Sequence, residues 1–243
     1  MNKPDPHSAL DAESQNKLTL QGLRLYNQLL LHPLFQGMSH DDLEQVITQT
    51  KFDFRKYATG EVIAREYDTC SHVVFLLDGT TSIHSSSDDH SYSILETIDG
   101  PWMVPITNLF GLQQYYTRTF TAENVCHVLT IDKTEVMHLC DDFLIFRFNL
   151  LNILTAALQR RERALWQNAP QSLEQRIERF FSERCITPHG AKTFLIKMTR
   201  LAEEMGDSRL DVSRALNNMQ RRGLIILHRG KIIIPDPHDR KNG

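Results

Sequence analysis

The stretch RLAEEMGDSRLDVSRALNNMQRRGLI, residues 200–225, constrains the fold more than any other because it contains two short helix patterns separated by a tight break. Thr199 can cap a helix over residues 200–205, and Gly206 permits the sharp turn that follows. Ser208 can cap the next helix, with Asp211 at the capping-box position, and Gly223 can end it. The sequence therefore predicts two short helices joined by a tight turn.

The second of these helices has two different faces. Its core face is formed by apolar residues at i, i+3, i+4 and i+7, which are Val212, Ala215, Leu216 and Met219. The opposite face carries Leu210, Ser213, Arg214, Asn217 and Arg221, with Arg209 on the flank. Arginine can pair with guanine and asparagine with adenine, so this face is typical of helix-turn-helix DNA readers. The alternative is an ordinary solvated helix, since an exposed Arg or Asn alone indicates nothing.

The residues after this helix favour DNA. The run LIILHRGKIIIP predicts a β-hairpin with a two-residue turn at Arg229-Gly230. Residues 171–243 carry 14 Lys and Arg against 9 Asp and Glu, whereas residues 1–170 carry 13 against 21, so only the second part is expected to meet a polyanion. The candidate DNA contacts are Ser208, Arg209, Leu210, Ser213, Arg214, Asn217, Arg221, Arg222, Arg229 and Lys231, of which the last three lie where phosphates would run.

The first half of the chain has a different character. Residues 17–31 have helical periodicity, and short β-branched and aromatic runs with turn signals between them follow from about Lys51 to Ile131. Strands at this spacing predict an antiparallel sandwich or barrel. Residues 1–16 are polar and lack the apolar core of a signal peptide, so we expect a disordered lead-in.

A long helical pattern over residues 132–168 separates the two parts, and Asn168-Ala169-Pro170 ends it. It carries two apolar stripes, which are Phe143, Phe146, Leu150, Ile153 and Ala157 on one side and Leu151, Leu154, Leu158 and Leu165 on the other. A helix that is apolar on two sides needs two partners. We expect the β domain to cover one side and a second copy of the chain the other; burial of both within one chain is the alternative.

Other classes of protein find little support. No run of residues is long and apolar enough to span a bilayer, and no nucleophile motif, HExxH or Gly-rich phosphate loop indicates an enzyme. The cysteines, Cys70, Cys126, Cys140 and Cys185, are far apart and are expected as reduced thiols in the cytoplasm. Scattered histidines could supply a metal or haem site, but are expected as surface or core residues; these are His72, His84, His90, His127 and His138.

The whole chain resembles the cyclic-AMP receptor protein and fumarate-nitrate reduction regulator family of bacterial transcription factors, over roughly residues 30–235. The resemblance is strongest in MTRLAEEMGDSRLDVSRALNNMQRRGLIILHRGKIII, where the family pattern Ser-Arg-x-x-Val-x-Arg appears as residues 208–214. It implies base and phosphate contacts for Arg209 and Arg214. Leu210 stands where many members carry a polar reader, which puts the usual operator sequence in doubt.

The front domain shows the β-roll spacing of this family at Lys56, Gly60-Glu61 and VVFLLDG. The family then has a Gly-Glu pair before a short helix and an Arg-Ser pair after it, which bind a cyclic nucleotide. Here Pro105 lies near the Glu position and Tyr116-Thr117 align with Arg-Ser, so the cyclic-nucleotide function is not carried over. Arg118 is one residue away, which on a strand points it to the other face. The expected effector pocket is formed by Trp102, Tyr115, Tyr116, Thr117 and Arg118.

The expected fold is therefore α+β: a β-roll (double-stranded β-helix) domain over residues 17–131, a dimerisation helix over 132–168 and a winged helix-turn-helix over 169–243. The expected function is a homodimeric, sequence-specific transcription regulator that binds a roughly palindromic duplex. RNA polymerase is a further expected partner, and no association with a membrane is expected. Without cysteines before Cys70 we expect no iron–sulfur cluster, and no cofactor is predicted. The alternative is a sensor that acts mainly through protein contacts, with the winged helix as a docking surface.

Overall fold

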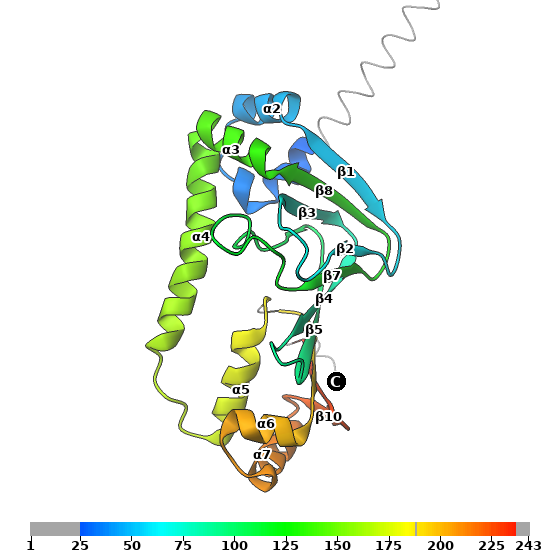
Figure 1. Cartoon of the computed structure of the whole chain (residues 1–243), viewed down its shortest axis with the longest axis vertical. Coiled ribbons are helices and arrows are strands. Elements are labelled where there is room, and N and C mark those ends of the chain that lie inside the picture. The colour runs from blue at the N-terminus through cyan, green and yellow to red at the C-terminus, as the bar shows by residue number, and fades with distance from the viewer. Residues whose placement is uncertain (1–24, 188, 237–243) are drawn as a thin grey trace, which may run out of the picture.

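The computed structural model describes residues 25–187 and 189–236 (Figure 1). The expected lead-in over residues 1–16 and the first part of the helix predicted over 17–31 lie outside the described residues, and residues 25–30 are helical. The other elements are η1 (Pro33–Phe35), α2 (His40–Gln49), β1 (Phe52–Tyr57), β2 (Val62–Ala64), β3 (His72–Asp78), β4 (Thr80–Ser86), β5 (Tyr92–Asp99), β6 (Trp102–Met103), β7 (Thr119–Ala122), β8 (Cys126–Asp132), α3 (Lys133–Asp142), α4 (Leu144–Leu165), α5 (Leu173–Arg184), β9 (Lys192–Ile196), α6 (Met198–Met205), α7 (Arg209–Arg221), β10 (Ile226–His228) and β11 (Lys231–Ile234).

Two antiparallel sheets form the β-roll domain, which we define as the described residues up to 131. One sheet has the strand order β1-β8-β3-β6, and the other begins β2-β7-β4-β5 and continues into the second half of the chain. Helix α4 runs down one side of the molecule from this domain to the winged-helix domain, residues 169–236 (Figure 1). The α+β fold expected from the sequence is confirmed.

The β-roll strands follow from alternating side chains. In β4 every second residue is buried, whereas the middle of β3, residues 73–76, is buried throughout because both faces of this strand are covered. Gly79 links these two strands with φ +98°, and a Cβ there would lie 2.7 Å from the carbonyl oxygen of Val125. Only glycine fits this turn, because a side chain would meet backbone.

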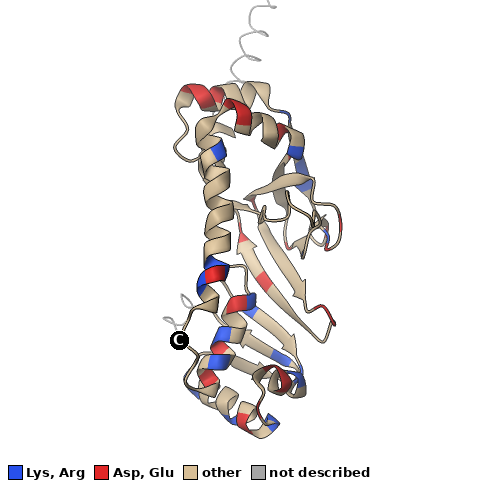
Figure 2. Ribbon diagram, turned by 60° about the vertical axis from the view of Figure 1, so that its left-hand side comes forward, with Lys and Arg blue, Asp and Glu red and all other residues tan. Residues whose placement is uncertain are grey.

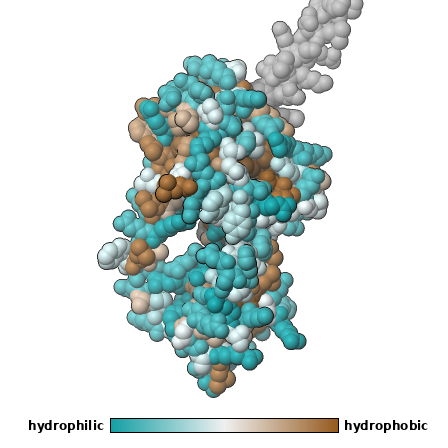
Figure 3. All heavy atoms as spheres, viewed as in Figure 1, coloured by the Kyte–Doolittle hydropathy of each residue, from teal (hydrophilic) through white to brown (hydrophobic). Residues whose placement is uncertain are grey.

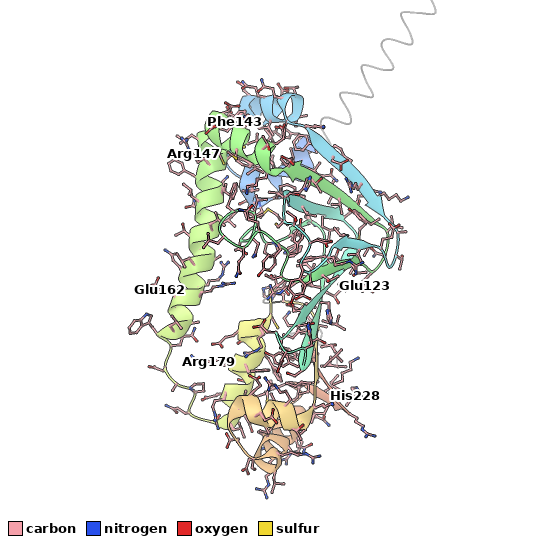
Figure 4. The ribbon with its side chains drawn as sticks, in the orientation of Figure 1. Glu123, Phe143, Arg147, Glu162, Arg179 and His228 are labelled. Atoms are coloured by element: carbon pink, nitrogen blue, oxygen red, sulfur yellow. The ribbon has the colours of Figure 1, made fainter. Side chains whose placement is uncertain are left out.

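The helix predicted over residues 132–168 is not continuous, and this prediction was wrong. The chain breaks at Phe143, whose φ of −121° and ψ of 104° are extended, so that α3 and α4 are separate helices (Figure 4). The break lets both helices pack on one core: Phe143 is itself buried, as are Leu139 of α3 and Phe146 of α4. Asp141 and Asp142 also disfavour continuation, since carboxylates in the last turn of α3 oppose the helix dipole.

A second core lies under the helices of the winged-helix domain. Helices α5, α6 and α7 enclose it together with β9 and the hairpin β10–β11. The hairpin has the predicted two-residue turn, with Gly230 at φ +71°. Helix α6 starts earlier than predicted: its N-cap is Lys197, without a side-chain cap, so Thr199 does not cap it. Strand β9 ends at Ile196, Lys197 is still extended, and its carbonyl accepts the Leu201 amide at 3.0 Å, so the first helical turn forms directly after the strand.

The second sheet crosses from one domain to the other. Its full order is β10-β11-β9-β5-β4-β7-β2, so that β5 of the β-roll domain lies beside β9 of the winged-helix domain. The division of the chain at residue 168 therefore separates segments that share one sheet. Among the described residues, none of the helices could cross a membrane.

Candidate functional site

Helix α7 begins and ends at caps that its own sequence provides. Ser208 Oγ accepts a hydrogen bond from the Asp211 amide at 3.1 Å and donates one to the Asp211 carboxylate at 2.6 Å, as predicted. Gly206, with φ +63°, closes α6, and Gly223, with φ +70°, follows α7. The Leu224 amide donates to the Met219 carbonyl at 3.0 Å, which is the Schellman arrangement. Both helix ends are thus fixed by local hydrogen bonds.

The turn between α6 and α7 is held from outside by Arg176 of α5. Its Nη1 donates to the Met205 carbonyl at 2.9 Å, and its Nη2 forms an ion pair with Asp207. These bonds fix the angle between the two helices. The sequence gives no local signal for them, because Arg176 is one of several charged residues on an amphipathic helix and lies far along the chain from its partners.

The two faces of α7 differ as the sequence indicates. Its apolar residues, Val212, Ala215, Leu216 and Met219, are buried in the second core. Exposed side chains form the other face and its flank, namely Ser208, Arg209, Leu210, Arg214, Asn217 and Arg221, while Ser213 is half-buried. In Figure 1 this helix lies at the end of the molecule farthest from the β-roll domain. Because no other described helix or strand covers this face, it can enter a DNA groove.

The polar side chains on α7 bond mostly along the helix. Arg214 Nη1 lies 3.3 Å from Asp211 Oδ1, Asn217 Nδ2 donates to the Ser213 carbonyl at 2.8 Å, and Arg221 bonds to the Asn218 side chain. These are weak surface contacts, worth about 0.5 kcal/mol each. The side-chain donors therefore lie on the helix surface and are not bonded to another element. Base edges can take the place of these intrahelical partners.

Arg222, Arg229 and Lys231 differ in their surroundings. Arg222 pairs with Glu174 of α5, Arg229 is exposed at the tip of the hairpin, and Lys231 is half-buried at the start of β11. Basic residues are spread over this domain among acidic ones (Figure 2). A hairpin tip with an exposed arginine beside a helix-turn-helix has the geometry of a wing that contacts a DNA backbone.

Helix α4 keeps its two apolar stripes apart. Phe143, Phe146 and Leu150 are buried against the β-roll domain. On the other side, Leu151 is 51% exposed, Leu158 65% and Leu165 82%. Hydrophobic atoms accordingly reach the surface along the α4 side of the molecule (Figure 3). Ile153, Leu154 and Ala157 are half-buried, and Ile153 and Leu154 pack against the core of the β-roll domain.

A cavity of about 720 Å³ lies between the β-roll domain, α4 and α5. Four residues of the expected effector pocket line it: Tyr115, Tyr116, Thr117 and Arg118. The fifth, Trp102, does not; it packs on Phe120, with ring centroids 6.1 Å apart, and this part of the prediction was wrong. Arg118 also departs from expectation, because it faces the cavity along with its neighbours; residues 115–118 precede β7, so strand alternation does not apply to them.

The cavity wall contains polar groups without strong partners. Ser85 is 8% exposed, and its Oγ has no hydrogen-bond partner among the described residues. Arg118 donates one long bond, 3.5 Å, to the Arg184 carbonyl, and burial lowers the pKa of its guanidinium. Burial likewise raises the pKa of the Tyr116 hydroxyl, which bonds to Cys70. Because buried polar groups are normally satisfied, such a wall suits a polar ligand.

The cysteines and the histidines that the structure describes form no reactive cluster. Within the described part of the chain no group of three His, Cys, Asp or Glu residues could hold a metal ion, and the four cysteines are free. Burial raises the pKa of the Cys185 thiol to about 12 and also raises that of Cys70. His127 is engaged with Asp78 at 2.7 Å and His72 with Asp132 at 3.8 Å.

These features define a class of protein: a β-roll domain with a cavity, followed by a long helix and a winged helix-turn-helix. The cyclic nucleotide-binding domain model matches residues 54–143, and the Crp-like helix-turn-helix domain model matches residues 175–239. The chain belongs to the cyclic-AMP receptor protein and fumarate-nitrate reduction regulator family of transcription regulators. It is thus a regulator with a helix-turn-helix DNA-binding domain rather than a member of an enzyme family.

Solved structures show the same fold. The catabolite activator protein of Thermus thermophilus matches with a TM-score of 0.50 and 18% identity, over 86% of this chain and 97% of that one. The sensor domain of the transcriptional regulator DNR from Pseudomonas aeruginosa matches with a TM-score of 0.50 and 16% identity, over 62% and 97%. No curated protein sequence matches the chain significantly.

Proposed function

We propose that the chain is a homodimeric regulator that binds a roughly palindromic DNA site through the exposed face of α7. The observation that carries this proposal is that face itself: Arg214 and Asn217 stand exposed on a helix that is fixed at both ends and packed on its other side. Arginine and asparagine are the side chains that read guanine and adenine in the major groove. RNA polymerase is the further partner that the family resemblance implies.

The exposed stripe of α4 supports the dimer. Leucines that are half or more exposed at Leu151, Leu158 and Leu165 follow helical spacing, as in helices that pair with a copy of themselves. A two-fold axis along α4 would relate two copies of α7. These would enter successive major grooves about 34 Å apart, on half-sites about one helical turn apart.

The cavity of the β-roll domain supports a small polar effector other than a cyclic nucleotide. Pro105 lines it near the position of the family's ribose-binding Glu, and Tyr116 and Thr117 take the place of the Arg-Ser pair. The charged residues on the wall are of both signs, with Arg118 and Arg161 as well as Glu66 and Asp88. Such a mixed wall favours a ligand with less charge than a cyclic phosphate.

Genome-wide mapping of the DNA that the chain occupies in its own cell tests the proposal. We expect a shared, roughly palindromic sequence among the occupied sites. The purified chain should bind this duplex more tightly than a scrambled one, with an affinity that falls as salt rises. Absence of salt-dependent binding to duplex DNA would favour the alternative, a sensor whose winged helix docks on protein.

A further inference from the structure

The pairing of β5 with β9 makes a structural junction between the two domains. Five residue pairs are in antiparallel register, from Tyr92 opposite Ile196 to Glu96 opposite Lys192. Strand β5 is paired with β4 on its other edge, so it is a fully integrated strand of the β-roll domain. The winged-helix domain is therefore attached to the rigid sheet of the β-roll domain, in addition to its covalent link to α4.

Apolar contacts strengthen this junction. Ile94 of β5 lies opposite Phe194 of β9, is 3% exposed and belongs to the core of the winged-helix domain rather than to that of its own domain. Tyr92 packs on Phe180 of α5, with ring centroids 5.6 Å apart. Ile94 and Tyr92 of the β-roll domain thus complete the hydrophobic core that supports α7.

A single carboxylate holds the polar side of the junction. Glu96 is fully buried, and its two oxygens accept the Ile186 amide at 3.0 and 2.9 Å. The Thr187 amide and hydroxyl donate to Oε1 at 3.1 and 3.2 Å, and Lys192 Nζ lies 3.8 Å away. Every partner belongs to the segment that leads from α5 into β9. A buried charge costs several kcal/mol unless it is paired and hydrogen-bonded, and here the winged-helix domain supplies all of these partners.

Two peripheral contacts close the junction. Arg184, the last residue of α5, donates from Nε to the Tyr92 hydroxyl at 2.8 Å. Arg200 of α6 lies 3.4 Å from Asp89 in the β4–β5 hairpin. Both α5 and α6, which carry α7, are therefore bonded to this hairpin.

The junction leaves the DNA-reading face of α7 open. Helix α7 lies at the far end of the molecule from the β-roll domain (Figure 1), and the side chains of its polar face are exposed, apart from the half-buried Ser213. Outside the junction, the connection between Leu165 at the end of α4 and Leu173 at the start of α5 joins the domain to α4, and Arg118 adds one long bond, 3.5 Å, to the Arg184 carbonyl. A flexible linker of this length lets its ends separate over a range on the order of 15 Å, which is too loose to fix the spacing of two reading helices.

We propose that Glu96 is a positioning residue for DNA recognition: it fastens the winged-helix domain to the β-roll sheet in the orientation in which two copies of α7 engage two half-sites together. This inference rests on the proposed function as a dimer on a two-half-site duplex. Two domains held in the correct orientation lose little freedom when the second half-site binds, which raises the effective concentration of the second contact.

The first test uses the full chain with Glu96→Gln, which keeps the size of the side chain and removes its charge. We expect affinity for the mapped two-half-site duplex to fall about tenfold, because the second contact loses effective concentration. Affinity for a duplex with one half-site should change less than about twofold. Glu123→Gln is the matched control: it removes an exposed carboxylate from the turn between β7 and β8 of the same domain and should change neither affinity (Figure 4).

The second test locks the junction with a disulfide. Ser93 and Leu195 lie opposite each other in the register of β5 and β9, at a separation that a cross-strand disulfide can span. Oxidised Ser93→Cys/Leu195→Cys protein should keep wild-type affinity for the two-half-site duplex, and the same crosslink should restore affinity to Glu96→Gln. Each single-cysteine variant controls for the substitutions and the native thiols.

The outcomes separate this inference from the proposed function. If the crosslinked chain loses specific binding, the docked orientation is not the one that binds DNA. An equal change on both duplexes after Glu96→Gln, or no change on either, also overturns the positioning role. If Glu96→Gln fails to fold, the crosslinked Glu96→Gln chain takes its place: folding and wild-type affinity with the crosslink would support the positioning role, and failure to fold with the crosslink would overturn it. Failure of the wild-type chain to bind its mapped duplex would instead overturn the proposed function, and this inference with it.

Discussion

Arg222 Nη1 lies 2.7 Å from Glu174 Oε2, which ties the residue after α7 to the first turn of α5. The sequence alone predicts a phosphate contact for Arg222. In the structure its guanidinium already has a carboxylate partner, whereas Arg229 at the hairpin tip is exposed. The two arginines are therefore expected to act differently on DNA.

Arg229→Ala should weaken binding to every duplex alike, because a phosphate contact carries no sequence information. We expect the slope of log affinity against log salt to flatten by about one counterion per half-site. Titrations of specific and scrambled duplexes at several salt concentrations measure both effects. Arg222→Ala should change that slope less than Arg229→Ala and lower stability by about 1 kcal/mol at most, since the Arg222 side chain of the ion pair is 61% exposed. A larger change of the slope from Arg222→Ala than from Arg229→Ala would show that Arg222 makes the phosphate contact.

Arg214→Ala should remove a base contact. Arg214 projects from the exposed face of α7, where its side chain pairs with Asp211 one turn away. We expect a loss of about 1–3 kcal/mol per half-site on the mapped duplex, with relaxed preference at one base pair and little change on a scrambled duplex. Lys56→Ala, which removes an exposed positive charge from β1, controls for net charge. Equal losses on both duplexes would show that α7 does not read bases.

Leu158→Asp should break the dimer. Leu158 is 65% exposed in the single chain, so the substitution does not disturb a monomer core, yet a carboxylate in a helix pair would be buried without a partner. We expect the mass by light scattering to halve at micromolar concentration. Leu112→Asp introduces the same change at a fully exposed position and should leave the mass unaltered. A monomeric wild-type chain, or a dimeric Leu158→Asp, would contradict the proposed interface.

Cyclic AMP should bind weakly or not at all. Tyr116 and Thr117 carry no guanidinium at the family's phosphate-binding positions, and Pro105 gives the ribose no carboxylate. Arg118 faces the same cavity, but it stands one residue beyond the family's pair and its guanidinium is buried. Each missing charge-assisted hydrogen bond costs about 1.5–3 kcal/mol, so the loss of two weakens binding by about a hundredfold or more. Calorimetric titration of the full chain measures this, and duplex DNA added to the same sample verifies that the protein is active. A micromolar dissociation constant for cyclic AMP would contradict it.

Stability should depend on pH through His32. This residue is 1% exposed beside Phe75, and burial lowers its pKa from 6.5 to about 4. The unfolded chain therefore binds a proton below pH 6.5 that the folded chain does not, so His32 lowers stability progressively as pH falls from 6.5 to about 4. The loss should reach on the order of 3 kcal/mol. Denaturant unfolding of wild type and His32→Leu at pH 7 and 4.5 measures it; the variant should lose less stability between the two. Equal losses would show that His32 does not titrate in this range.

The elements of the winged helix that the sequence predicts correctly are those fixed by neighbours in the chain. Ser208 caps α7 through an amide three residues away, and Gly206 and Gly223 adopt the positive φ that only glycine adopts readily. Such contacts are encoded within one turn of helix. The apolar spacing of α7 likewise identifies its buried face without reference to other elements.

The parts that the sequence does not predict depend on distant partners. Glu96 alternates correctly within β5 but gives no sign that its carboxylate binds Ile186 and Thr187. Phe143 fits a helical stripe, yet its burial requires an extended backbone. Strand β1 is hard to recognise for another reason: three of its four middle residues are charged and all four are exposed, so the strand contributes no buried face that its sequence could indicate.

The sheet shared by the two domains has a consequence for dividing the molecule. A fragment that begins after residue 168 would carry the helices that read DNA but would lack Ile94 from its core and would present β9 as an open strand edge. Unpaired edges of this kind recruit strands from other molecules. The β-roll fragment would present the complementary edge of β5 and leave the Glu96 carboxylate without its donors. The smallest unit of this chain that satisfies its own backbone thus extends across both domains.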